Sequence, residues 1–195
     1  MVDLLKVYGD CWGGEAGEWN TSLQNKYLEY MFACFLEENF IIHNDFDILN
    51  IGIGAGYWDR YLSYKVMNGS LTSIDIDREC SDNLAACLEN ENNTNPIKVI
   101  CADAITHDFD KKFDLVTMVG SAVAESGKTK AIIAKAISLI KENGALYLQI
   151  LHKDTDFDID AFCGEHNVRI DKRLVDDKYG LSLIHISEPT RRSYI

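Results

Sequence analysis

The sequence lacks the features of a membrane-bound or modular protein. No apolar run approaches the length needed to span a membrane, and no apolar stretch follows basic residues near the first residue. The 195 residues also contain no internal repeat, low-complexity segment or linker, and their number suits one domain with a sizeable core. We therefore expect a cytoplasmic protein of one main domain with no membrane partner.

The sequence also lacks the cysteine patterns that bind metals or form redox centres. Its six cysteines are scattered, without a C-x-x-C pair and without histidines placed to complete a ligand set. Several fall at apolar positions of expected helices or strands, where a thiol acts as a small core residue. We expect reduced thiols and no bound metal. The six are Cys11, Cys34, Cys80, Cys87, Cys101 and Cys163.

Basic residues are few. The chain has 19 lysines and arginines against 31 aspartates and glutamates, which gives a net charge of −12 with histidine neutral. A surface this acidic repels a phosphate backbone, and no basic stripe offsets the repulsion. The composition argues against a nucleic-acid substrate, and nothing in the sequence predicts the oligomeric state.

A glycine-rich stretch stands out against this background. Residues 46–51 form a short apolar run typical of a buried strand, and residues 58–62 begin a helix. Between them Gly52, Gly54 and Gly56 let the chain turn tightly and approach a ligand closely. A strand, a glycine loop and a helix N-terminus in this order predict a nucleotide site at the carboxyl end of a parallel sheet.

Expected strands and helices alternate along the rest of the chain. This alternation predicts an α/β protein with a doubly wound, mainly parallel sheet in a three-layer αβα arrangement. The expected strands are 46–51, 71–75, 97–101, 113–119, 145–151 and 168–175, and the later helices are 78–91, 128–141 and 158–166.

The N-terminal part has a different character. Residues 8–20 mix glycine and aromatic side chains without a helix or strand period. Two interpretations remain open, an arm whose rings simply pack or a mobile cover over a ligand. Asn20 or Thr21 can cap a helix whose apolar residues recur at helical spacing up to Phe35. We expect the arm and this helix to occupy residues 1–40.

An acidic residue follows the second expected strand. Asp75 lies about twenty residues beyond the glycine loop, where a carboxylate can accept both hydroxyls of a ribose. The alternative role, capping a turn or helix, suits Asp77 better. We therefore predict that Asp75 binds a ribose.

The glycine spacing distinguishes between nucleotide-binding families. A dinucleotide fingerprint is G-x-G-x-x-G, whereas the third glycine here comes one residue early, at Gly56, and Tyr57 follows it. This G-x-G-x-G pattern resembles motif I of the class I S-adenosylmethionine-dependent methyltransferases. Residues 113–116 (Phe-Asp-Leu-Val) and the turn at 140–145 are also similar to that family. The resemblance covers about residues 22–151 and implies a Rossmann-like fold, S-adenosylmethionine as cofactor and methyl transfer.

The resemblance also implies roles for residues at other strand ends. Asp103 stands where the family has an acidic residue that receives the adenine amino group, and the amide of Ala104 would face the ring. Val119 and Gly120 stand where a loop borders the methionine moiety and the acceptor. The expected cofactor-binding residues are Asn50, Gly52, Gly54, Gly56, Asp75, Ile76, Asp103, Ala104, Val119 and Gly120.

The chain departs from the family pattern at several points. Position 50 is Asn where the family often has Asp or Glu, and an amide would hold the cofactor's ammonium group less strongly. No Asn-Pro-Pro-Tyr motif follows the fourth strand and no catechol-type carboxylate cluster is present, so we expect another small-molecule acceptor. Glu125, His152 and Asp154 are candidate proton acceptors, but none is singled out, and the catalytic residue stays unassigned.

Three other interpretations are weighed against methyl transfer. An NAD(P)-dependent oxidoreductase would also use Asp75, but the missing x-x-G spacing and Tyr57 argue against it. A phosphate-binding loop at 126–129 (Ser-Gly-Lys-Thr) would require a glycine at position 122, which is Ala. A non-catalytic module that binds S-adenosylmethionine remains the third alternative.

The last stretch of the chain looks foreign. The eleven residues 181–191 are what one reading frame of a common transposase-based sequencing adapter encodes. The alternative is a natural C-terminal strand. On the adapter interpretation, the methyltransferase domain spans residues 1–180, and residues 181–195 are a non-native tail. Since the family fold ends in an antiparallel strand inserted near the sheet edge, we expect that strand to be missing and this tail to be poorly packed.

Overall fold

The structure is a computed structural model of the chain. It describes residues 23–93, 97–120, 123, 126–152 and 157–187, so the expected N-terminal arm and the capping residues Asn20 and Thr21 lie outside the described residues. Within this part, no helix combines the length and the apolar character that a membrane span requires.

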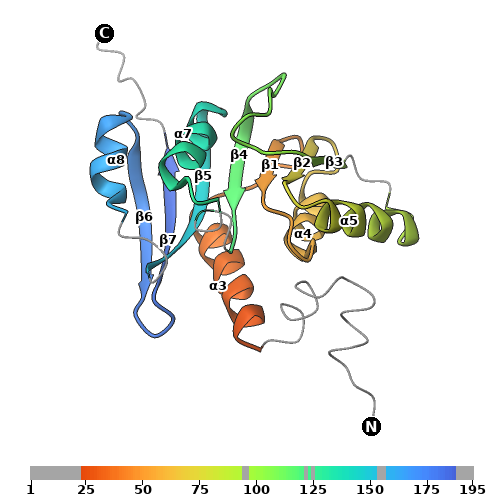
Figure 1. The fold of residues 1–195 in the computed structure, drawn as a ribbon, viewed down its shortest axis with the longest axis horizontal. Helices are drawn as coiled ribbons and strands as arrows, with labels where there is room; N and C mark the ends of the chain where they lie inside the picture. The colour runs from red at the N-terminus through yellow and green to blue at the C-terminus, as the bar shows by residue number, and fades with distance from the viewer. Residues whose placement is uncertain (1–22, 94–96, 121–122, 124–125, 153–156, 188–195) are drawn as a thin grey trace.

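The described chain forms one sheet with helices between most of its consecutive strands (Figure 1). The strands are β1 (Asp47–Ile51), β2 (Ser70–Asp75), β3 (Ile97–Cys101), β4 (Phe113–Met118), β5 (Ile140–Leu151), β6 (Arg169–Asp176) and β7 (Leu181–Ser187). The helices are α3 (Leu23–Asn39), α4 (Tyr57–Lys65), α5 (Arg78–Asn90), α7 (Thr129–Ser138) and α8 (Ile159–Glu165).

The seven strands lie in the order β3-β2-β1-β4-β5-β7-β6. The first five in this order pair in parallel, and β7 runs antiparallel to both of its neighbours. The chain moves outward from β1 to β3 in one direction and then from β4 to β5 in the other. The carboxyl ends of β1 and β4 therefore flank the switch point of the sheet, where ligands of such folds bind.

Helices cover both faces of the sheet, because apolar side chains of the central strands project from both faces. On one face, α3 and α4 pack on Ile48, Leu71 and neighbouring residues. On the other, α7 and α8 pack on residues that include Leu49 and Ile74. Successive residues of β1 thus enter opposite cores, because side chains of a strand alternate between its faces. The predicted three-layer αβα fold with a mainly parallel sheet is confirmed.

The prediction of a missing last strand and a poorly packed tail is wrong for residues 181–187. These residues form β7, which pairs along its length with β5 and with β6. Leu181 and Leu183 enter the core under α3, while Ile184 and Ile186 enter the core under α7 and α8. A segment with buried apolar side chains on both of its faces can pair with a strand on each side and lie inside the sheet, whatever the origin of its sequence.

The end of α7 also differs from expectation. The predicted helix over 128–141 stops at Ser138, and β5 begins at Ile140 rather than Ala145. The predicted Asn143-Gly144 turn is present as an irregularity within β5, where Asn143 has a φ of 65° and the pairing with β4 shifts register. Ile140, at the start of this strand, pairs with Phe113 of β4, and this pairing brings the residues directly after the helix into the sheet.

Candidate functional site at the strand ends

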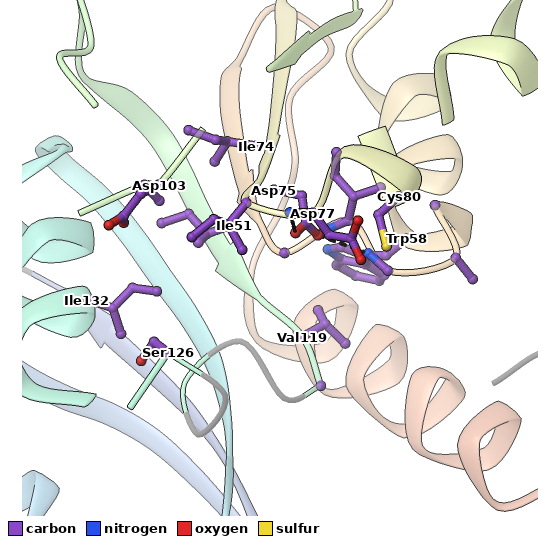
Figure 2. Close-up of a pocket in the computed structure, with 18 of the residues that line it drawn as sticks. Ile51, Trp58, Ile74, Asp75, Asp77, Cys80, Asp103, Val119, Ser126 and Ile132 are labelled. Carbon is purple, nitrogen blue, oxygen red and sulfur yellow. Dashed lines mark hydrogen bonds between the residues drawn. The ribbon is translucent and has the colours of Figure 1, made fainter. Parts of the chain in front are cut away.

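A cavity of about 420 Å³ opens at the carboxyl ends of the parallel strands (Figure 2). The strand ends of the switch point and the first turns of α4, α5 and α7 contribute to its wall. Nine of the ten predicted cofactor residues line it: Gly52, Gly54, Gly56, Asp75, Ile76, Asp103, Ala104, Val119 and Gly120. The fold therefore brings together side chains that lie far apart in the sequence.

The glycine loop turns with all three glycines in left-handed backbone conformations. Gly52, Gly54 and Gly56 have φ values of 91°, 52° and 75°, which favour glycine over residues with a side chain. A Cβ atom on Gly54 would meet nothing within 4 Å, whereas one on Gly56 would lie 3.0 Å from Leu84 Cδ1. The loop thus shows bare backbone to the open cavity at Gly54 and packs tightly on α5 at Gly56. This cradle fits a ligand that approaches the main chain closely.

Asp75 ties the glycine loop to the end of β2. Its Oδ2 accepts hydrogen bonds from the amides of Ile53 at 2.6 Å and Gly54 at 3.3 Å, and its Oδ1 accepts one from the Asp77 amide at 2.9 Å. Asp77 itself caps α5 by accepting a hydrogen bond from the Glu79 amide at 2.8 Å. Both carboxylates line the cavity, and Asp77 caps α5, which is the role that its place in the sequence suggests.

Asp103 and its neighbours form the wall across from this loop. The Asp103 Oδ1 accepts a hydrogen bond from the Ile105 amide at 2.8 Å, so the carboxylate caps its own turn while it also lines the cavity. Ala104 is buried beside it, and Ile76 presents an apolar side chain that is 74% exposed at the cavity. Apolar surfaces next to a carboxylate suit a flat heterocycle that carries an amino group.

The end of β4 supplies a third part of the wall. Gly120 has a φ of 80°, and its amide donates a hydrogen bond to Oε1 of the buried Gln149 on β5 at 2.9 Å. This bond fixes the turn that carries Val119 into the cavity. The turn after β4 is thus held by the sheet.

Asn50 is the one predicted cofactor residue that is not among those lining the cavity. It is fully buried beneath the glycine loop. Its Nδ2 donates hydrogen bonds to the Gly52 carbonyl at 2.9 Å and to Asp59 Oδ1 at 2.8 Å, while its Oδ1 accepts one from the Thr117 hydroxyl at 2.8 Å. These bonds turn the amide toward the interior and tie the glycine loop to α4 and β4.

Asp59 is a buried carboxyl group that sequence reasoning missed. It lies on α4 under the loop with no exposed surface. Burial raises its pKa to about 6, against the opposing effect of nearby Ser73 and Asn50. Its Oδ2 and the Ser73 hydroxyl both lack a hydrogen bond of normal geometry within the described structure. In the sequence, Asp59 is one of several polar residues of an expected helix, so no local pattern indicates that its side chain is buried.

Glu29 is the second residue that the sequence did not point to. It lies on α3 and lines the cavity. Burial raises the pKa of its carboxyl group, and Lys26 opposes that shift. Its position between apolar residues of an amphipathic helix gave no reason to single it out.

The candidate proton acceptors are not assembled at the cavity. Glu125 and Asp154 lie outside the described residues. His152 has its Nε2 2.8 Å from the Ser182 hydroxyl of β7 and is not part of the cavity wall. Among the residues that the structure describes, no three His, Cys, Asp or Glu side chains come together as a metal site.

The residues of the alternative phosphate-binding loop lie beside the switch point. Ser126 and Lys128 line the cavity, but they precede α7 and follow β4. A phosphate-binding loop normally follows the first strand, and that place belongs to Gly52–Gly56. In this structure the loop that follows the first strand is therefore the glycine loop, not residues 126–129.

Together, the doubly wound sheet, the glycine loop at the switch point and the acidic strand ends define a Rossmann-like nucleotide-binding protein. A sequence model of the family described as methyltransferase domain matches residues 48–144. This match, the curated relative and the solved structures support a class I S-adenosylmethionine-dependent methyltransferase.

Individual relatives agree with this assignment. Malonyl-[acyl-carrier protein] O-methyltransferase 2 of Ilyobacter polytropus is 23% identical over 190 residues, which cover 92% of this chain and 71% of that protein. A SAM-dependent methyltransferase of Aquifex aeolicus superposes with a TM-score of 0.68 at 15% identity, over 88% of this chain and 97% of the other. The N-methyltransferase NodS of Bradyrhizobium japonicum, bound to S-adenosyl-L-homocysteine, superposes with a TM-score of 0.71 at 11% identity, over 96% and 100%.

Proposed function

We propose that this S-adenosylmethionine-dependent methyltransferase acts on a small-molecule acceptor, with its cofactor held in the cavity at the switch point. One observation carries the placement of the cofactor. The bare backbone at Gly54 and the carboxylates of Asp75 and Asp103 face the same cavity from three strand ends. This set matches a nucleoside that carries hydroxyl and amino donors.

The adenosine half of the cofactor would lie between β2 and β3. Asp75 would accept a hydrogen bond from a ribose hydroxyl through the acceptor site that its three amide partners leave unused, since a carboxylate has about four acceptor sites. Asp103 would accept from the adenine amino group through Oδ2, to which no described residue donates a hydrogen bond. Ile76 and Ala104 would cover the faces of the ring.

The methyl-bearing end would lie toward β4. When bound, the cofactor supplies an electrophilic methyl group, and the chain's own residues contribute proximity and alignment. Val119 and Gly120 border that end of the cavity, and the bond from Gly120 to Gln149 holds their turn in place. An acceptor that is already nucleophilic needs no strong base, which is consistent with the unassigned catalytic residue.

The charge of the chain supports a small acceptor. A net charge of −12 disfavours nucleic acid. We also propose that one domain carries the activity and that it works in the cytoplasm. The single sheet joins both hydrophobic cores, and among the described residues the cysteines Cys34, Cys87, Cys101 and Cys163 form no disulfide.

Calorimetric titration of the full chain with S-adenosylhomocysteine and with NADH tests the placement. We expect binding of the first alone. Asp75→Ala should weaken it about 100-fold, since hydrogen bonds to a carboxylate are among the stronger ones. Asp108→Ala removes an exposed carboxylate outside the cavity and should change nothing.

Circular dichroism on each variant separates loss of binding from loss of fold. Unchanged binding by a folded Asp75→Ala variant would remove Asp75 from the site. Binding of NADH alone would restore the oxidoreductase alternative.

A further inference from the structure

Helix α3 brings a carboxylate to the end of the cavity that lies away from Asp103. Glu29 lines the cavity, and one helical turn later the Phe32 ring meets the Trp58 ring edge-on, with centroids 5.0 Å apart. Val119 packs against the same cluster of residues. Figure 2 shows α3 passing beside Val119, with Asp103 on the opposite side of the cavity. Glu29 therefore belongs to the Val119 end.

The Glu29 carboxylate is partly withdrawn from water. No described residue donates a hydrogen bond to it, although burial already disfavours its charged form and raises its pKa. Lys26, one turn earlier, favours the charge, and its Nζ lies 4.1 Å from the centre of the Tyr57 ring on the cavity wall. A carboxylate in this position is stabilised by a ligand that carries a positive charge.

The other acidic groups of the wall are committed elsewhere. Asp75 holds the amides of the glycine loop, Asp77 caps α5, and Asp103 lies at the far end. Asn50 is buried beneath the loop with its amide bonded to Asp59. Among the described residues, Glu29 is thus the acidic side chain left for a cation at the Val119 end.

The cofactor brings such a cation to that end. If its nucleoside half lies at Asp75 and Asp103, its amino-acid half extends toward Val119 and Tyr57, where an ammonium group needs an acceptor. We infer that the Glu29 carboxylate binds the α-ammonium group of the cofactor's methionine moiety. This inference rests on the proposed position of the cofactor, and it adds an N-terminal helix to the residues that select the ligand.

A comparison of two ligands isolates this contact. S-Adenosylhomocysteine carries the amino-acid group, whereas 5′-methylthioadenosine keeps the nucleoside and the sulfur but lacks it. Calorimetry on the full chain should show that Glu29→Gln weakens S-adenosylhomocysteine about tenfold, the lower range for a hydrogen bond to a charged group. Binding of 5′-methylthioadenosine should change less than about twofold, since the variant loses nothing that this ligand contacts.

Glu38→Gln is the matched control, because it removes the same charge from an exposed position of the same helix. It should leave both affinities unchanged. Equal losses for both ligands in Glu29→Gln, or no loss for either, would overturn the contact. A wild-type chain that binds neither ligand would instead remove the cofactor placement on which the inference rests.

A second measurement needs no variant. The analogue of S-adenosylhomocysteine without its amino group should bind the wild-type chain about tenfold more weakly than the parent ligand. The same affinity for both ligands would show that no acidic group receives the ammonium, and the inference would fail even if Glu29→Gln did not fold.

Discussion

Two regions of the same sheet are held mainly by different kinds of contact. In the cofactor half, which we define as β1 to β4 with α4 and α5, Asp75 and Asn50 hold the glycine loop through specific hydrogen bonds. In the C-terminal edge, defined as β5, β7 and β6, apolar side chains of β7 enter both hydrophobic cores. Among the described residues, each region also buries two polar atoms without a hydrogen bond: Asp59 Oδ2 and the Ser73 hydroxyl in the first, and the Tyr147 hydroxyl and His185 Nδ1 in the second. The glycine loop of the first region is thus held by directed bonds, and the second region is held mainly by packing.

The stacking of Tyr147 and His185 illustrates the second principle. The two rings lie 4.3 Å apart between centroids with an angle of 19° between their planes. Burial lowers the pKa of His185, although Asp171 on β6 acts against the shift, so the ring is held neutral and packs as an aromatic. A region built in this way depends on shape, and many apolar segments of suitable alternation would fit it.

The largest effect should come from breaking the packing of the C-terminal edge. Leu183 is fully buried on β7. Leu183→Asp should lower the free energy of unfolding by at least about 4 kcal/mol, because it removes core contacts and buries a polar group. Urea denaturation measures the loss. The matched control is Val175→Asp on β6, where the side chain is 49% exposed and little change is expected. Equal stability of the two variants would mean that β7 contributes no core.

A smaller effect should come from the buried carboxyl of the cofactor half. Since the folded chain raises the pKa of Asp59 from 3.8 to about 6, the folded state binds the proton more tightly than the unfolded state. Its stabilising effect is complete below about pH 4 and is lost as the pH rises through about 6. The side chain of Asp59→Asn cannot ionise. The free energy of unfolding of this variant, taken relative to that of the wild type, should therefore rise by about 2 kcal/mol when the pH is raised from 4.5 to 7.5.

Denaturation curves of both chains at the two pH values give this difference directly, since other titrating groups cancel. A constant difference between Asp59→Asn and wild type across the range would show that the carboxyl does not titrate there. In that case the hydrogen bonds around Asp59 would keep its carboxyl group in the same protonation state at both pH values.

The smallest effect should come from the ion pairs that join the two regions. Lys141 Nζ of β5 lies 2.9 Å from Asp47 Oδ2 of β1 and 2.8 Å from Asp114 Oδ2 of β4. All three side chains keep more than a quarter of their surface exposed. Lys141→Met should therefore cost only about 0.5 kcal/mol in denaturation at low salt and less at high salt.

Lys130→Met is the control for this last variant. It removes an exposed lysine of α7 that forms no ion pair in the described part of the chain. A loss of several kcal/mol in Lys141→Met alone would show that the two regions depend on directed charge at their junction.

The same contrast explains what could be predicted from the sequence. Gly52, Gly54 and Gly56 carry a local signal, because their spacing and the strand before them follow from adjacent residues. The strand-end carboxylates Asp75 and Asp103 follow from the alternation of strands and helices. The fold class and most strand positions were therefore accessible from the sequence.

The errors arose where tertiary contacts decide. The segment of β7 was expected not to form a strand because its sequence resembles an adapter. Whether it pairs depends on the free edges of β5 and β6, which cannot be recognised from the sequence of the segment itself. Asn50 points inward because Asp59 and Thr117 are there to bond it. Glu29 reaches the cavity only through the way α3 docks on the sheet.

The insertion of β7 between β5 and β6 has a consequence for the order of folding. β6 joins the sheet through β7, and the two are consecutive strands in antiparallel pairing. They can form a hairpin locally, within microseconds, before meeting the rest of the chain. The parallel strands β1 to β5 close longer loops and assemble more slowly. The sheet is thus expected to be completed by docking of a preformed hairpin, and the exposed edge of β5 is the surface most open to aggregation until that step.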